Sequence, residues 1–107
     1  MLVPNKPANE AVRLKRLKET GLLGSASDVD YQRFTELALR LFDVPIALIS
    51  LVDENRQWFK AKSGLGASET SRDISFCGHA ILQDGVFEVP DALKNPSFAD
   101  NPLVTGE

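Results

Sequence analysis

The sequence has few of the residues that build catalytic and metal sites. Its 107 residues include one cysteine, one histidine, one tryptophan and one tyrosine. A single cysteine cannot form an intrachain disulfide, as is usual for proteins of a reducing compartment. A zinc site needs three or four ligands, and one cysteine with one histidine leaves only carboxylates to complete it. We therefore expect no metal.

Long apolar runs are also missing. The longest, VPIALISLV over residues 44–52, is far shorter than the ~20 residues that cross a bilayer. The opening MLVPNKPANE has no apolar core of the kind that a secretory signal needs. We expect a cytoplasmic protein with no membrane partner. The net charge of −3 predicts no nucleic-acid partner, and the basic residues among the first 18 fit a solvated helix face.

Two helices are predicted in the first 42 residues. EAVRLKRLKET, over residues 10–20, follows Asn9, a favoured N-cap residue, and ends at Gly21. DVDYQRFTELALRLF, over residues 28–42, has apolar residues at intervals of three and four. That spacing predicts a stripe that faces the core, made of Tyr31, Phe34, Leu37, Ala38, Leu41 and Phe42.

The pattern then becomes that of strands. PIALISLV, over residues 45–52, is apolar on both faces and is predicted to be a central strand covered on both sides. DENR, over residues 53–56, predicts a hairpin turn. QWFKAKS, over residues 57–63, alternates and predicts a half-exposed or edge strand. Its predicted faces are Phe59 and Ala61 on one side, and Trp58, Lys60 and Lys62 on the other.

Less regular stretches complete the chain. GLGASETSRD, over residues 64–73, is predicted to be a loop, and its glycine spacing is not that of a phosphate-binding loop. GVFEVPD, over residues 85–91, predicts a third strand, and residues 92–107 a polar, proline-containing tail.

The single cysteine and the single histidine lie two positions apart in SFCGHAIL, residues 75–82, which predicts a short helix capped by Ser75. Side chains at positions i and i+2 of a helix point about 200° apart. Cys77 and His79 therefore do not form a nucleophile–base pair if the segment is helical. We expect Cys77 to be a buried thiol and His79 to bond a loop carbonyl or line a pocket. A redox role for Cys77 is a less favoured alternative.

Three stretches, in this order and spacing, resemble a known family. They are RFTELALRLFDVPIALISLVDENRQWFKAKSGL, then ETSRDISFCGHAIL, then VFEVPDALKNPSFADNPLVTG. Together they are similar to the N-terminal two-thirds of GAF domains, of the type found in bacterial sensor histidine kinases and GGDEF diguanylate cyclases. The resemblance implies an α+β fold: a GAF/PAS-like antiparallel sheet with helices packed on one face and a ligand pocket on the other. It further implies that the domain is truncated.

From this resemblance we expect residues 1–24 to form an N-terminal helix and linker, and residues 25–107 a partial GAF domain. The implied function is a non-catalytic sensory module that binds an unidentified small molecule, forms a homodimer, or both, to control a fused output domain. The alternative is an interaction module without a ligand. The candidate ligand-binding residues are Trp58, Phe76, Cys77, His79 and Asp91. Trp58 fits a pocket floor and packing under a loop equally well, and Phe76 fits the core better than a ligand contact.

Overall fold

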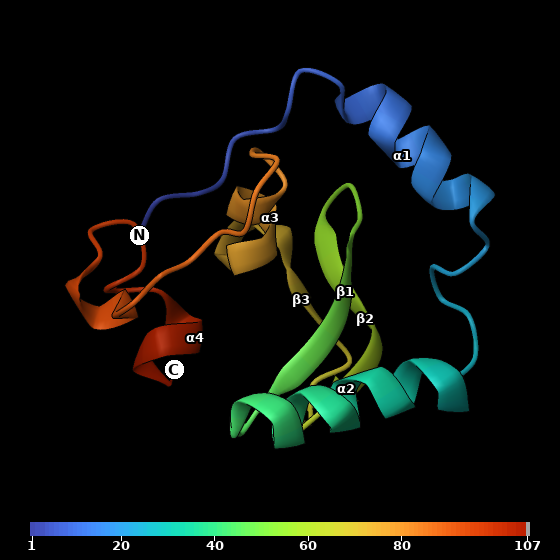
Figure 1. Ribbon diagram of the computed structural model, residues 1–107. Coiled ribbons are helices and arrows are strands. Elements are labelled where there is room, and N and C mark those ends of the chain that lie inside the picture. Colours follow the sequence, from blue (N-terminus) through green and yellow to red (C-terminus); the bar gives the residue numbers. More distant parts are fainter. Residues whose placement is uncertain (107) are drawn as a thin grey trace.

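The computed structural model describes residues 1–106 and has an α+β fold, as predicted (Figure 1). A three-stranded antiparallel sheet lies at its centre with helices around it. None of the helices in these residues is long and apolar enough to cross a membrane. In chain order the elements are α1 (Glu10–Glu19), α2 (Val29–Phe42), β1 (Ala47–Val52), β2 (Arg56–Ser63), β3 (Glu69–Ser71), the 3₁₀ turn η1 (Arg72–Ile74), α3 (Phe76–Ala80), the 3₁₀ turn η2 (Ala92–Lys94) and α4 (Pro102–Thr105).

The strand order is β1-β2-β3, so β2 is the central strand and β1 lies at an edge. This reverses the prediction that β1 would be central and β2 half-exposed. The third strand comes from residues 69–71, which were predicted to be a loop. These three residues pair with Arg56, Gln57 and Trp58, on the side of β2 away from β1. The hairpin turn between β1 and β2 is confirmed, and the Asp53 amide donates to the Arg56 carbonyl at 2.8 Å.

Residues 85–91 form no strand, contrary to the prediction. Their apolar alternation reflects packing against the C-terminal segment instead of pairing in a sheet. The ring of Phe87 lies 6.0 Å from that of the buried Phe98. The segment that follows is folded rather than an irregular tail, because Asn101 caps α4 and its side chain donates to the Ile74 carbonyl at 2.9 Å.

A β-bulge in β2 decides which side chains face each side of the sheet. Ser50 pairs with Phe59, whereas the preceding Ile49 pairs with Ala61, so that Lys60 is an extra residue. Neighbouring β1 residues point to opposite faces, so Phe59 and Ala61 do as well. The predicted grouping of Phe59 with Ala61 is therefore wrong. Phe59 faces α3, and Ala61 faces α2.

Polar contacts attach α2 to the sheet. The Gln32 amide donates to the Lys62 carbonyl at 2.7 Å and to Ser63 Oγ at 3.0 Å, and the buried Thr35 hydroxyl lies 3.0 Å from the same Oγ. Most of the predicted core-facing stripe of this helix points away from the sheet instead, although the Tyr31 ring faces it, 5.3 Å from Lys60 Nζ. Phe34 is 65% exposed and Leu41 68%. We call Phe34, Leu37 and Leu41 the α2 stripe; no residue described in the structure covers it.

A buried arginine joins α1 to the sheet. Arg72 is 4% exposed, and its guanidinium binds the Glu10 carboxylate and donates to the carbonyls of Asp53 and Glu54 at 3.1 and 3.2 Å. Arg13 also binds Glu10, at 2.8 Å. The helix begins at Glu10, but the side chain of Asn9 makes no capping bond. The first turn of α1 is thus held by one long-range ion pair, with Arg72, and one local pair, with Arg13.

The first four residues contact both the C-terminal segment and α3, and so link the two (Figure 1). The Leu2 amide donates to the Ser97 carbonyl at 3.0 Å, and the Met1 ammonium pairs with Asp100. Pro4 is buried against Gly78, where an added Cβ would lie 2.8 Å from the proline ring. This contact gives a structural reason for glycine between Cys77 and His79.

The Glu10–Arg72 pair makes a prediction about acid stability. Hydrogen bonds from Arg72, then from Arg13, lower the pKa of Glu10 from 4.5 to about 2, against the opposing effect of burial. A carboxylate with a lowered pKa stabilises the fold above its unfolded pKa, and that stabilisation is lost as the pH falls toward 2. We expect Glu10→Gln to cost about 2 kcal/mol at neutral pH. The cost should shrink between pH 5 and pH 2, as measured by urea unfolding.

Asp30→Asn is the matched control, because Asp30 forms a fully solvated pair with Arg33 at 3.6 Å. Exposed pairs of this kind contribute less than about 0.5 kcal/mol. A stability difference between wild type and Glu10→Gln that stays constant down to pH 2 would contradict the assignment.

Candidate functional site

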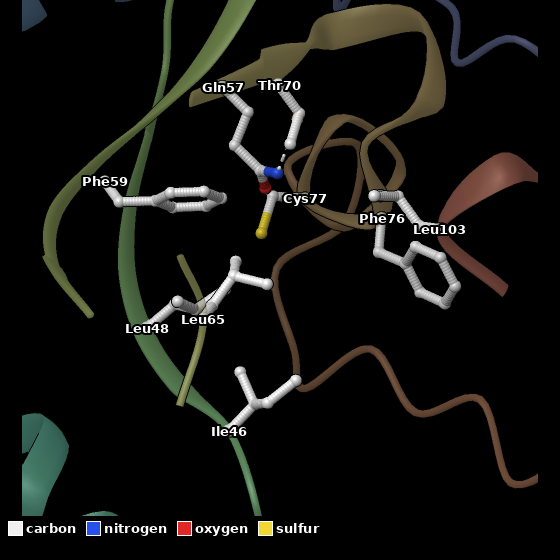
Figure 2. A pocket seen from close by; sticks show the side chains of 9 residues that line it. All are labelled: Ile46, Leu48, Gln57, Phe59, Leu65, Thr70, Phe76, Cys77 and Leu103. Carbon is white, nitrogen blue, oxygen red and sulfur yellow. Dashed lines mark hydrogen bonds between the residues drawn. The ribbon is translucent and has the colours of Figure 1, made fainter. Parts of the chain in front are cut away.

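A cavity of about 450 Å³ lies between the sheet and α3, on the face opposite α2 (Figure 2). We call it the α3 cavity. The strands form one wall, α3 and α4 form the other, and the loop after β2 closes one end. Its lining residues are Ile46, Leu48, Gln57, Phe59, Leu65, Thr70, Phe76, Cys77 and Leu103.

Local hydrogen bonds explain why α3 begins where it does. Ser75, which is 0% exposed, accepts a bond from the Gly78 amide at 3.0 Å and donates to the Arg72 carbonyl at 2.7 Å. The predicted cap is therefore confirmed, and it fixes the first turn of the helix against η1. With this turn fixed, Phe76 and Cys77 are placed on the cavity wall.

The lining is almost entirely apolar. Its polar members include Gln57 and Thr70, whose side chains are joined by a bond of 3.1 Å from the Gln57 amide to the Thr70 hydroxyl. Figure 2 shows both side chains pointing into the cavity from adjacent strands. Cavities of roughly 300–1,000 Å³ with apolar walls and a few polar groups are typical of small-molecule sites.

Cys77 points its sulfur into the cavity, toward Phe59 (Figure 2). Burial raises the pKa of this thiol, and the hydroxyl of Ser50 lowers it in part. A thiol with a raised pKa is neutral at physiological pH and is a poor nucleophile.

His79 lies on the other side of α3, away from the α3 cavity. Its Nε2 lies 3.0 Å from the Leu2 carbonyl, and its ring packs edge-on against Phe98 at 4.9 Å. Because the segment is helical, Cys77 and His79 point apart and cannot exchange a proton directly. Among residues 1–106, no group of three His, Cys, Asp or Glu side chains is placed to hold a metal ion.

The other candidate residues fall in three different places. Phe76 lines the cavity and also stacks on Phe98, with ring centroids 4.2 Å apart. Trp58 pairs with Leu51 on the opposite face of the sheet, and is outside the cavity. Asp91 caps η2, accepting a bond from the Leu93 amide at 3.1 Å, and is also outside.

Sequence reasoning missed Gln57 and Thr70, the hydrogen-bonding pair of the cavity. Gln57 is an uncharged polar residue at the start of an alternating strand, beside the aromatic residues Trp58 and Phe59, and this position was the available signal. Thr70 gave none, because its strand is three residues long and polar throughout.

Comparison with known proteins gives one informative match. No family model matches the chain. All 107 residues align, at 45% identity, with a cyclic di-GMP phosphodiesterase of Pseudomonas aeruginosa. The chain spans 18% of that protein's length.

The position of Cys77 makes a prediction about its reactivity. We expect iodoacetamide to alkylate the folded protein at pH 7.5 at least about tenfold more slowly than the same protein unfolded in urea, because the half-buried thiol has a raised pKa and is neutral. Intact-mass spectrometry over time measures both rates. Alkylation of the folded protein as fast as that of the unfolded chain would instead favour a redox role.

Proposed function

We propose that this chain is a GAF-type sensory segment of a signal-transduction protein, and that it binds a small molecule in the α3 cavity without catalysing a reaction. The observation that carries the proposal is the cavity itself, a concave apolar space with a convergent polar pair. The order of sequence stretches that resembles a GAF domain supports the same assignment.

The signalling context of the proposal comes from the relative. A protein named as a cyclic di-GMP phosphodiesterase contains a segment 45% identical to this chain, and more than four-fifths of that protein lies outside the segment. We propose that the present chain likewise regulates an output activity in cyclic di-GMP signalling. In this proposal the catalysis belongs to other parts of the protein.

A regulatory ligand acts by binding one conformation more tightly than another. The α3 cavity is suited to this role because the N-terminal segment contacts the elements on both sides of one wall. Leu103 of the lining belongs to α4, and Met1 and Leu2 bind the segment just before α4. Cys77 belongs to α3, and Pro4 packs against Gly78 of that helix. A ligand that changes the spacing of α3 and α4 therefore also moves the segment leading into α1.

An exchange of segments tests this function. The matching segment of the Pseudomonas aeruginosa phosphodiesterase is replaced by the present chain, either unchanged or with Leu48→Trp, which fills the cavity. We expect the hydrolysis rate of cyclic di-GMP in cell extract, where the native ligand is present, to change at least about threefold between the two proteins, a free-energy bias of about 0.6 kcal/mol.

The control for the exchange is Leu93→Trp, an equally large substitution at an exposed position outside both the cavity and the α2 stripe. It should leave the rate within error of the unchanged chimaera. Equal rates for all three proteins, each folded by circular dichroism, would contradict a regulatory role for the cavity.

A second candidate function, homodimerisation, is favoured by two features. The outer edge of β1 is unpaired within the described residues, and this strand carries no charged side chain to discourage pairing. The α2 stripe is exposed beside it on an adjacent helix. An uncharged edge strand is complementary to a second copy of itself run antiparallel, so we propose that a second copy of the chain pairs here.

Sedimentation velocity tests this interface. We expect the chain to dimerise and Phe34→Glu to shift it to monomer, because a buried charge replaces an apolar contact. Glu36→Gln, on the same helix but outside the stripe, should leave the dimer intact. A wild-type chain that remains a compact monomer at every concentration would overturn this candidate.

A further inference from the structure

We propose that the ligand of the α3 cavity is an uncharged, mainly apolar ring compound with one hydrogen-bonding group, and not a nucleotide. This inference rests on the proposed function, because it specifies the chemistry of a ligand that the proposal requires. It also excludes feedback regulation by cyclic di-GMP at this cavity. A cavity of this kind does not bind cyclic di-GMP, so the segment reports a different signal.

The first observation is the charge of the lining. None of the nine lining residues is acidic or basic. The thiol of Cys77 is also neutral, because burial raises its pKa. A phosphate or carboxylate that entered the cavity would lose its hydration without gaining a cation, which costs several kcal/mol for each charge.

The second observation concerns two cations close in sequence to lining residues, Lys62 and Arg72, both of which already bond to acceptors within the chain. The register places Lys62 on the cavity face of β2, but its Nζ donates to the carbonyls of Gly66 and Ala67 at 2.7 and 3.1 Å. The Arg72 guanidinium, just before α3, is buried with the Glu10 carboxylate and two carbonyls. Each would have to give up these acceptors to bind an anionic ligand.

The third observation concerns the start of α3. Helix N-termini bind anions through unpaired amides. Here α3 has only five residues, the Gly78 amide bonds to Ser75 Oγ, and the Ser75 amide bonds to the Arg72 carbonyl at 3.0 Å. Among the lining side chains, the main hydrogen-bonding groups are therefore those of the Gln57–Thr70 pair.

The size and shape of the cavity agree with one ring system. Its volume of about 450 Å³ lies in the lower half of the range for small-molecule sites. Phe59 and Phe76 provide aromatic walls, and Leu48 and Leu65 provide aliphatic ones. A flat ring between these side chains would place one polar substituent at Gln57.

Matched probes test the charge preference directly. 2-Naphthol is uncharged at pH 7, and 2-naphthoate has the same rings with a carboxylate. Each is titrated into the ¹⁵N-labelled chain, as is cyclic di-GMP. We expect saturable shifts of the Gln57, Thr70 and Cys77 amides with 2-naphthol, at least about tenfold weaker binding of 2-naphthoate, and no cavity shifts with cyclic di-GMP.

A variant that adds a positive charge to the lining tests the same preference in the opposite direction. Leu103 lines the cavity but is 47% exposed, so Leu103→Lys should fold and should bring 2-naphthoate to at least the affinity of 2-naphthol. Leu93→Lys, at an exposed position outside the cavity, should retain the wild-type preference for 2-naphthol.

The outcomes separate the two proposals. Tighter binding of 2-naphthoate or cyclic di-GMP to the wild-type cavity would overturn the inferred ligand class and leave the sensory function standing. The absence of cavity shifts with all three probes, in a chain whose spectrum is that of a folded protein, would overturn both.

Discussion

The guanidinium of Arg72 is buried between α1 and the turn that joins β1 to β2, directly before the helix that carries Cys77. A buried cation is tolerated only where its charge is paired and its N–H groups are satisfied. Glu10 supplies the charge, and the carbonyls of Asp53 and Glu54 supply further acceptors. The backbone carbonyl of Arg72 also accepts a hydrogen bond from the Ser75 hydroxyl. One residue thus fixes the relative positions of α1, the hairpin and α3.

The two faces of the sheet are packed differently: α2 lies directly on one face, and the α3 cavity lies on the other. On the α2 side, the bulge at Lys60 turns Ala61 and Ser63 toward α2, and the small side chains allow Gln32 and Thr35 to reach the strand. On the opposite side, Phe59 points toward α3, and side chains at the cavity wall do not meet across it. The first residues of the chain cover α3 from outside. The first four residues therefore pack on the elements around the cavity.

Local sequence signals predicted the elements whose structure is decided locally. Asp28 and Ser75 cap α2 and α3 through bonds within two or three residues, and the hairpin turn is equally local. Features decided by distant partners were missed. Glu69–Ser71 becomes a strand only because β2 offers an edge, and the bulge at Lys60 cannot be read from alternation. The α2 stripe has the period of a core helix, but periodicity does not say what covers it. Similarly, Cys77 was placed near a site, whereas Gln57 and Thr70 meet only in the folded sheet.

The central claim is that a cavity with an uncharged, mainly apolar lining exists between the sheet and α3. Xenon is the most direct probe, because it carries no charge or hydrogen-bonding group and enters apolar cavities. The measurement is a methyl spectrum of the labelled chain under increasing xenon pressure. We predict saturable shifts of the Leu48, Leu65 and Leu103 methyl groups, with none at Leu37 on α2 beyond a linear pressure effect. Saturable shifts at Leu37 alone, or at no methyl group, would contradict the account.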